Sequence, residues 1–388
     1  MLETHDHAAR FKARQSRHQR HESEDRAPRS TQTAAPLDAF LRDARFDPDD
    51  PAALGDMLGA LIARGYDRAP WLPLPARGDT LVRWRALADV AACDLGLVKL
   101  FEGHTDALAI LAELDGPPPP EASRWGVWAA EAPDACVRAA DAGVRRSGDA
   151  AAQLRLTGTK AWCSGARALS HALVTAWLDD EPVLAAVALN QASISIDTSK
   201  WQAVGMQATA SADVTFDATP ATLVGAPHAY VRRPGFWQGG AGIAACWYGA
   251  AARIGRTLRD ACARRADAHR LAHLGATDVA LEAAAAVLRE TAAWIDAYPS
   301  VDAQVVALRA RLVVETAAST VIEHATRALG AGPLCRDARF ARALADLPVF
   351  LRQSHAERDL AALGERLAAD AGGVSAPAGS SAGARWTL

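Results

Sequence analysis

The spacing of hydrophobic residues changes twice along this chain of 388 residues, and this change constrains the fold more than any other feature of the sequence. Between residues 36 and 114 apolar side chains recur every three or four positions, which predicts helices with one buried face. Between residues 125 and 225 the period becomes two, and Gly, Asp and Asn separate the short runs, as is typical of β-strands. After residue 234 the helical period returns and persists.

Three packed regions follow from this pattern, and the chain is long enough for all of them. We expect an α+β fold that is mostly α, with an N-terminal helical domain (36–120), a central antiparallel β domain (121–228) and a C-terminal four-helix bundle (229–370). Thr277 and Ser300 are expected to cap the second and third helices of the bundle, and its fourth helix is expected at residues 338–363. The tails at 1–35 and 371–388 are rich in charge or in Gly and Ser, so we expect them to be disordered.

Composition excludes several classes of function. The formal net charge is -3 and the sequence pI is near 6.4, so we expect no binding to nucleic acid or to an anionic membrane surface. The six cysteines are scattered without a C-x-x-C pair, which argues against a zinc site or a disulfide framework and is typical of a reducing cytosol. No run approaches the roughly 18 apolar residues of a membrane span, and the N-terminus lacks the apolar segment of a signal peptide. We therefore expect a cytoplasmic protein without a membrane segment.

Residues 156–166, LTGTKAWCSGA, predict a strand, a Gly turn and a second strand whose tip carries Trp162, Cys163 and Ser164. An aromatic face beside a small hydroxyl is what a flat redox ring needs, since the ring can stack on one and receive a hydrogen bond from the other. Residues 205–217, GMQATASADVTFD, add another Gly turn followed by an alternating strand. Either motif alone is more often a matter of core packing than of cofactor binding.

In this order the two segments resemble the middle domain of acyl-CoA dehydrogenases, which bind FAD. WGVWAAEAP at 125–133 stands where that family has a T-E-P triplet, HATRALGAGPL at 324–334 resembles its Gly-rich helix end, and CRDARFARALAD at 335–346 resembles its closing R-D-A-R helix. The resemblance extends over about residues 36–364. It implies an FAD-dependent oxidoreductase that dehydrogenates an acyl thioester at its α,β carbons, with hydride transfer to flavin N5 and an unidentified electron acceptor.

The resemblance also assigns the residues around the cofactor. Ala129, Ala130 and Glu131 would lie beside the pyrimidine edge of the flavin, and Trp162 would lie against the isoalloxazine ring. Ser164 would replace the family's usual threonine as the hydroxyl that donates near N5.

A second group of residues is implied to act between subunits. Arg327 stands at the position of a family glutamine, and Gly330, Ala331 and Gly332 would form a turn that reaches the FAD of a neighbouring subunit. Small residues let the backbone approach a ligand closely, and Arg327 could pair with the pyrophosphate. The alternative is that Gly330 only ends its helix. The resemblance therefore implies a homo-oligomer.

The catalytic base of the family is missing from its usual place. Counting nine residues past Arg336 gives Ala345, and residues 231–255, where some members carry their glutamate, contain no carboxylate. The substitutes that we consider are Glu102, Asp346 and Glu357, because burial raises the pKa of a carboxyl and lets it act as a base near neutral pH.

Each substitute has a plainer interpretation. Glu102 and His104 could form a hydrogen-bonded pair at a helix end, and Glu357 could belong to an exposed, salt-bridged helix face together with His355. The phosphate-binding signatures are also replaced, since APDACVRA follows Glu131 and HRLAHLG occupies 269–275. Two other functions stay open: a reduced-flavin-dependent monooxygenase, which needs no base because oxygen is activated at the flavin, and a non-catalytic scaffold that kept the fold.

Overall fold

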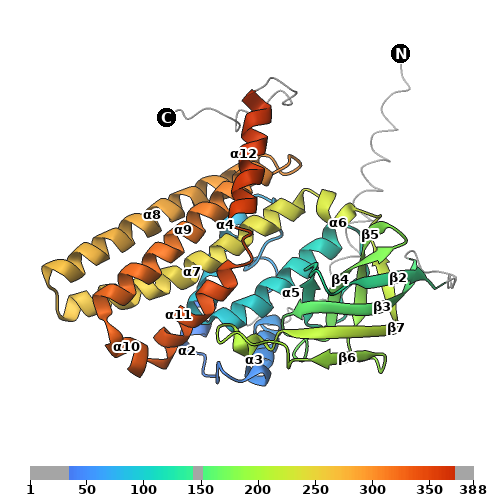
Figure 1. The fold of residues 1–388 in the computed structure, drawn as a ribbon, viewed down its shortest axis with the longest axis horizontal. Helices are drawn as coiled ribbons and strands as arrows, with labels where there is room; N and C mark the ends of the chain where they lie inside the picture. Colours follow the sequence, from blue (N-terminus) through green and yellow to red (C-terminus); the bar gives the residue numbers. More distant parts are fainter. Residues whose placement is uncertain (1–34, 143–151, 372–388) are drawn as a thin grey trace, which may run out of the picture. The chain divides into compact units, whose positions relative to one another are not determined.

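Helices come first and last along the chain and strands lie between them, in the computed structural model that describes residues 35–142 and 152–371. This order confirms the predicted alternation of helical, extended and helical segments. Figure 1 shows the strands gathered at one end and the longest helices at the other. The two tails predicted to be disordered lie outside the described residues, apart from residues 35 and 371.

The first helices form in the region where the helical period predicted them, and aspartates begin two of them. Asp50 Oδ1 accepts a hydrogen bond from the amide of Ala52, and Asp94 Oδ1 accepts one from the amide of Leu97, which satisfies donors that a helix start leaves free. The helices are α2 (Leu37–Asp43), α3 (Pro51–Ala63), α4 (Thr80–Cys93) and α5 (Leu95–Glu113).

Strands β4, β2, β3, β7 and β5 pair in that order, and β5 pairs again with β4, so these five strands close into a ring. Strand β1 adds to β4, and β6 adds to β7. The strands are β1 (Trp125–Trp128), β2 (Val137–Asp141), β3 (Gln153–Cys163), β4 (His171–Leu178), β5 (Glu181–Ala188), β6 (Ile194–Asp197) and β7 (Ala212–Val224).

The prediction of an antiparallel sheet is wrong at two places, because β1 and β2 both run parallel to β4. Neither is joined to β4 by a hairpin, and an alternating pattern carries no information about strand direction. Helix α5 covers the ring at β1, where Ile110 and Leu111 pack with Trp125 and Leu173 in one buried cluster. The helical segment and the strands therefore share a core.

Strand β3 is continuous over Gln153–Cys163, so the predicted Gly turn inside it is wrong. Gly158 has φ 119° and lies at a shift in the register with β7, where the extra residue belongs to β7, so the irregularity is a bulge of the neighbouring strand and not a turn. A Cβ at this position would collide with the carbonyl oxygen of Cys136, so the close approach of the chain there requires glycine.

The C-terminal helices start and stop at other residues than predicted. Asp267 caps α8 by accepting hydrogen bonds from two amides, whereas Thr277 is buried in the middle of that helix. The cap of α9 is Ala303 and not Ser300, and the predicted fourth helix is interrupted at residues 352–356. The helices are α6 (Ala229–Arg232), α7 (Gly235–Arg264), α8 (Ala268–Ala297), α9 (Gln304–Leu329), α10 (Ala331–Arg336), α11 (Ala338–Leu351) and α12 (Glu357–Ala371).

Helices α7, α8 and α9 lie side by side, with α4 packed on α7 and α11 crossing α7 and α5 (Figure 1). Helix α8 is the one helix among the described residues that is long and apolar enough to cross a membrane, with a mean hydropathy of 1.4 over 18 residues. This contradicts the expectation that no segment has that character. In the structure α8 packs along α9 and α7, and it leaves Val279 70% exposed.

Candidate functional site

The end of β3 holds an exposed tryptophan between buried neighbours. Trp162 is 58% exposed, whereas Ala161 and Cys163 are 7% and 0% exposed. Trp162 has φ 59°, and the register between β3 and β7 shifts between Lys160 and Cys163. The bulge interrupts the alternation of the strand and leaves the indole at the surface. We call residues 162–164 the tip; its indole is exposed, and the role of Trp162 as a wall for a flat ring stays a prediction.

A chain of hydroxyl groups connects the tip to the next segment of the chain. Ser164 Oγ lies 3.0 Å from Ser211 Oγ, which lies 3.0 Å from Thr209 Oγ1. Thr209 Oγ1 donates to the carbonyl of Met206 at 2.7 Å. Thr209 ends η1 (Gln207–Thr209), a short helical turn, and its carbonyl accepts from the amide of Gly165 at 2.8 Å. The two motifs singled out in the sequence are therefore in direct contact.

The end of β1 reaches the same place. Trp128 Nε1 donates to the carbonyl of Ser164 at 3.2 Å, so the half-buried Ala129 and Ala130 follow directly after a residue that contacts the tip. Small side chains here leave backbone amides and carbonyls accessible to a ring edge. The structure thus brings together the three segments 125–133, 156–166 and 205–217.

Glu131 does not offer a free carboxylate to a ligand. Its Oε1 accepts from Lys160 Nζ at 2.7 Å and from Thr175 Oγ1 at 2.7 Å. Burial alone would raise the pKa of Glu131, but the hydrogen bonds from Lys160 and Thr175 hold this pKa below its ordinary value. Glu131 Oε2 accepts from Trp177 Nε1 at 3.5 Å and the side chain is 47% exposed, so the place of Glu131 beside the flavin stays a prediction.

Sequence reasoning missed Lys160, which is fully buried in β3 and bonded to both Glu131 and Thr175. A buried ammonium needs a partner of opposite charge, and Glu131 provides it. The alternation of β3 was a usable signal, because it places the side chain of Lys160 on the same side of the strand as the buried Leu154 and Leu156.

Ala345, which stands at the family's usual position for the catalytic base, lies in a close contact between two backbone segments. A Cβ on Gly205 would collide with the carbonyl oxygen of Ala345, so α11 lies directly against the residue that precedes η1. In the next residue pair, the amide of Met206 donates to Asp346 Oδ1 at 2.5 Å. Residues 206–211 therefore connect Asp346, at one end, with Ser164 at the other.

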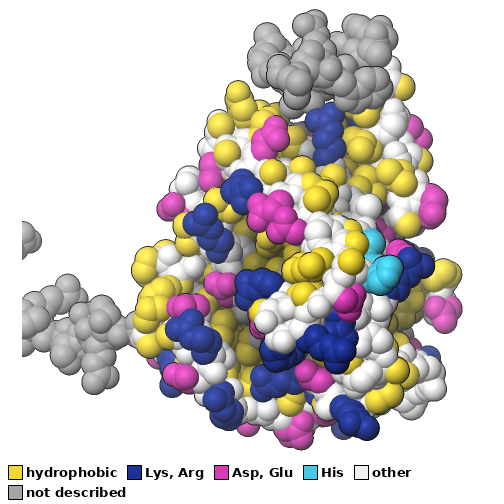
Figure 2. Space-filling model, turned by 90° about the vertical axis from the view of Figure 1, so that its left-hand side faces the viewer, with side chains coloured by type: hydrophobic (Ala, Val, Ile, Leu, Met, Phe, Trp, Pro, Cys, Tyr) yellow, Lys and Arg dark blue, Asp and Glu magenta, His cyan; other side chains and the backbone are white. Residues whose placement is uncertain are grey.

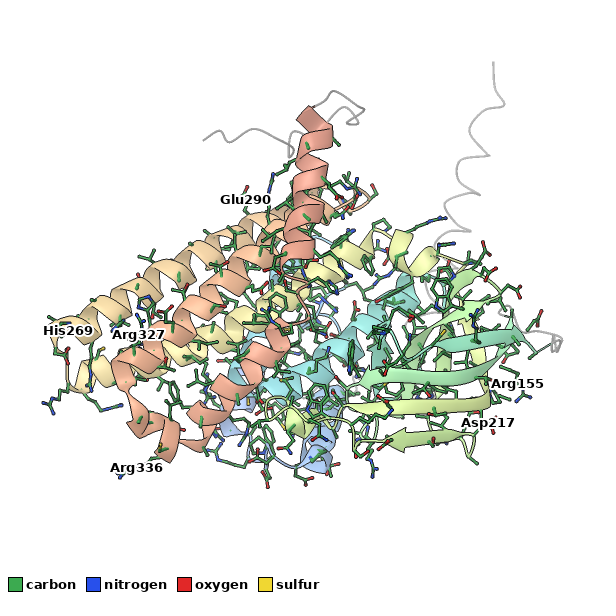
Figure 3. The ribbon with its side chains drawn as sticks, viewed as in Figure 1. Arg155, Asp217, His269, Glu290, Arg327 and Arg336 are labelled. Atoms are coloured by element: carbon green, nitrogen blue, oxygen red, sulfur yellow. The ribbon has the colours of Figure 1, made fainter. Side chains whose placement is uncertain are left out.

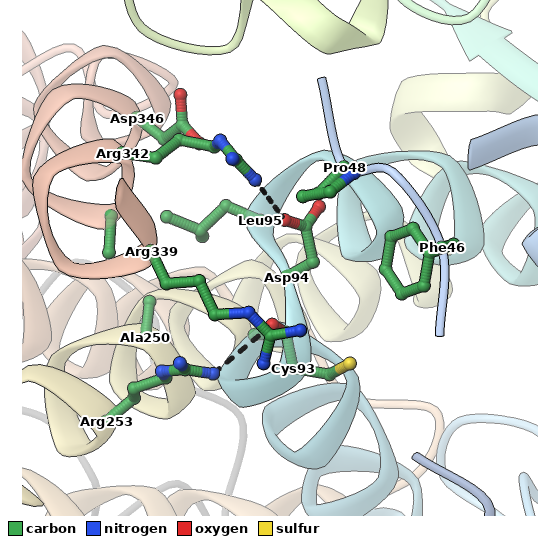
Figure 4. A pocket seen from close by; sticks show the side chains of 12 residues that line it. Phe46, Pro48, Cys93, Asp94, Leu95, Ala250, Arg253, Arg339, Arg342 and Asp346 are labelled. Atoms are coloured by element: carbon green, nitrogen blue, oxygen red, sulfur yellow. Dashed lines mark hydrogen bonds and ion pairs between the residues drawn. The ribbon is translucent and has the colours of Figure 1, made fainter. Parts of the chain in front are cut away.

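Asp346 lines a hollow between the α4–α5 junction, α7 and α11, with about 500 Å³ of empty space including the part open to solvent (Figure 4). Burial raises the pKa of Asp346 from an ordinary 3.8 to about 6. Arg342 lies 3.7 Å from Asp94 in this hollow, and Arg253 and Arg339 reach into it from α7 and α11. Of the three candidate bases, Asp346 is the one placed at an opening.

Glu102 is buried in α5, where burial raises its pKa, and it pairs with Lys99 at 3.6 Å. It does not pair with His104, so that alternative is wrong. His104 Nε2 lies 3.3 Å from Asp67 Oδ2, and its Nδ1 accepts from the amide of Trp125 at 3.2 Å. Residues two apart on a helix face different directions, which explains the separate partners.

Glu357 is exposed in the first turn of α12, a helix that packs against α9. Its neighbour His355 pairs with Asp359 at 3.4 Å, as the alternative of an exposed helix face predicted. None of the contacts of Glu357 in the described part of the chain brings it to the tip or to Asp346.

Arg327 is exposed near the end of α9 and pairs with Glu323 at 3.1 Å. Figure 3 places Arg327 at the opposite end of the molecule from the strand residues Arg155 and Asp217. The predicted turn of three residues is wrong, because Gly330 alone changes the chain direction, with φ 66°, and Ala331 and Gly332 belong to α10. Figure 2 shows basic side chains gathered on this end of the molecule.

No protein-family model and no curated protein matches this chain. Solved structures do match its fold. Methanesulfinate monooxygenase MsuC from Pseudomonas fluorescens has a TM-score of 0.69 at 19% identity, covering 89% of this chain and 97% of that one. FMN-bound TdsC from Paenibacillus sp. A11-2 has a TM-score of 0.64 at 18% identity, covering 82% and 96%.

A glutaryl-CoA dehydrogenase from Mycobacterium smegmatis in complex with FADH2 is equally similar, with a TM-score of 0.70 at 17% identity, covering 86% of this chain and 93% of that one. At these identities the similarity establishes the fold. The neighbours include both dehydrogenases and monooxygenases, so the fold alone leaves the reaction open.

Proposed function

We propose that this chain, which has the fold of the acyl-CoA dehydrogenases, binds a flavin at the tip of β3 and acts with the reduced flavin as a monooxygenase. The contact of Gly205 with the carbonyl of Ala345 carries this proposal, because it fills the place of the dehydrogenases' base with backbone. A monooxygenase needs no such base. Bound reduced flavin supplies two electrons with which O₂ gives one oxygen atom to the substrate and leaves the other as water.

The residues at the tip fit a flat ring system. Trp162 offers an exposed aromatic surface, Ser164 offers a half-buried hydroxyl beside it, and the backbone at Ala129 and Ala130 supplies polar groups along one edge. These residues would orient the ring and fix which of its faces meets the substrate. Similar structures hold FMN or FADH2, and our first choice is FAD, whose adenosine half would extend to Arg327 of a second copy.

A dehydrogenase is the second candidate, and one observation favours it. Asp346, with a pKa of about 6, is ionised at neutral pH yet basic enough to remove a proton. Against it, Asp346 Oδ1 is already bonded to the amide of Met206, and residues 206–211 stand between this carboxylate and Ser164 along the chain of hydrogen bonds. A thioester that reached Asp346 through the hollow would therefore be separated from Ser164 by residues 206–211.

The test starts with binding and continues with two separate reactions. Purified protein is first titrated with FMN and with FAD, each oxidised and reduced. In one assay, reduced flavin from a separate reductase is supplied in air with indole, dibenzothiophene or methanesulfinate as probes, and oxygenated products are measured. In the other, butyryl-, octanoyl- and palmitoyl-CoA are added without oxygen, and bleaching of the flavin is followed.

We expect flavin binding and slow or absent bleaching by all three thioesters, because a positioned base contributes about 10²- to 10⁴-fold. Rapid bleaching that is lost in Asp346→Asn would establish the dehydrogenase instead. A protein that binds neither FMN nor FAD in either redox state would support the non-catalytic scaffold.

A further inference from the structure

The hydroxyl chain at the tip has a fixed direction, and this direction is set at its inner end. A carbonyl oxygen only accepts, so the one proton of the Thr209 hydroxyl is used in its 2.7 Å bond to Met206. Thr209 must then accept from Ser211, whose own proton is used in that bond. Ser211 can therefore only accept from Ser164.

Burial keeps the chain in this direction. Thr209 and Ser211 are 1% and 3% exposed, so solvent offers them no other partner. Reversing the three hydroxyls would break the 2.7 Å bond from Thr209 Oγ1 to the carbonyl of Met206, which would keep only the longer bond of 3.1 Å from the amide of Thr209. The direction described makes three hydroxyl hydrogen bonds within the protein and the reversed direction makes two, so the direction described is favoured.

We propose that Ser164 acts as a hydrogen-bond acceptor toward the flavin site, and not as the donor that the sequence comparison implies. Its proton points to Ser211, so lone pairs are what its oxygen can present to a ligand. This inference rests on the flavin binding proposed above. An acceptor at Ser164 favours the reduced ring, in which N5 carries a hydrogen, over the oxidised ring, in which N5 only accepts. Such a preference suits a protein that takes up flavin already reduced.

The test measures the dissociation constants of oxidised and reduced flavin and the midpoint potential of the bound flavin. Ser211→Ala frees the proton of Ser164, so oxidised flavin should bind about tenfold tighter while reduced flavin is unchanged. Ser164→Ala removes the acceptor, so reduced flavin should bind about tenfold more weakly while oxidised flavin is unchanged. Either variant should lower the potential of the bound flavin by about 30 mV, since a tenfold change in a two-electron equilibrium is about 30 mV.

Two further variants guard against an effect of folding alone. Thr209→Val keeps the shape of the side chain but releases Ser211, so it should behave like Ser211→Ala. Thr215→Val is the matched control: Thr215 of β7 pairs with Thr159 of β3 by a hydroxyl contact of 2.9 Å, outside the chain of hydroxyls described above. It should leave both dissociation constants and the potential unchanged.

Variants at Ser211 and Thr209 that weaken both redox forms equally, with the potential unmoved, would overturn the proposal while leaving flavin binding established. A wild-type protein that binds neither form overturns it together with the proposed function.

Discussion

Trp162 is the residue on which the proposed flavin binding depends most directly, because its exposed indole is the one aromatic side chain of the tip. Replacing it with alanine should cost about 1 kcal/mol or more of stacking, which weakens flavin binding about fivefold or more. Trp162→Phe keeps an aromatic face and should retain most of the affinity. Titration of flavin fluorescence measures both variants. If Trp162→Ala and the wild type bind flavin with equal affinity, the flavin does not bind at the tip.

Asp346 makes the stability of the fold depend on pH. Its pKa rises from 3.8 to about 6 on folding, so between these values the folded state binds more protons than the unfolded state. Stability that is fully present below pH 3.8 is therefore lost as the pH rises through about 6, by about 3 kcal/mol. Asp346→Asn still accepts from the amide of Met206 but does not titrate.

The measurement is chemical unfolding of both proteins from pH 4 to pH 8. The difference between wild type and Asp346→Asn isolates the contribution of this carboxyl, and it should grow in favour of the variant as the pH increases. A difference that stays constant over this range would show that Asp346 is not desolvated in the folded state.

The sequence could single out individual residues where a short segment of the chain has a recognisable pattern. The segment LTGTKAWCSGA was enough to single out Trp162 and Ser164, because neighbours along the strand define a tip. The bond of Lys160 to Glu131 and that of Ser164 to Ser211 were not predicted, since each joins residues 29 or 47 positions apart. Such partners depend on the pairing of strands, which one sequence does not specify.

At the scale of elements, the contact between α11 and the turn before η1 depends on glycine. Gly205→Ala would drive a methyl group into the carbonyl of Ala345, so we expect a loss of about 1–3 kcal/mol of stability, as for overpacking. Gly275→Ala is the matched control, because Gly275 lies within α8 with open space around it, and alanine there should stabilise the helix by up to about 1 kcal/mol. Both free energies come from urea unfolding.

If Gly205→Ala is as stable as wild type, α11 can move away from residues 205–206. The place of the missing base would then be open to a substrate, as a dehydrogenase requires. Measuring acyl-CoA bleaching in this variant separates the two cases.

The order and type of the elements followed from hydrophobic period, since burial on one face of a helix or strand imposes 3.6 or 2 residues per repeat. Three features did not follow from it. Strand direction in the ring has no local signature, as β1 and β2 show. The start of α8 was misplaced because Asp267 and Thr277 are both good caps, and tertiary packing selects between them. Helix α10 begins directly after Gly330, where the glycines favoured a turn.

At the scale of the whole molecule, the place of Arg327 bears on assembly. Figure 3 shows Arg327 at the other end of the molecule from the strand residues Arg155 and Asp217, and in the proposed arrangement it would contact the flavin of another copy. The exposed apolar residues of α8, Val279 and Leu271, which are 70% and 51% exposed, favour association of the bundles. We therefore expect an oligomer in sedimentation experiments at micromolar concentration.

Arg327→Glu tests this arrangement, because FAD has a pyrophosphate and an adenosine that FMN lacks. A negative charge in place of Arg327 should weaken FAD binding by repulsion while FMN binding stays unchanged. The lost pair with Glu323 is exposed and is worth less than about 1 kcal/mol, so the fold should tolerate the change. Arg259→Glu, which breaks the comparable exposed pair with Asp260, is the control and should affect neither flavin. A monomer saturated with FAD, or equal loss of FAD and FMN affinity in Arg327→Glu, would show that each chain holds its flavin without a neighbour.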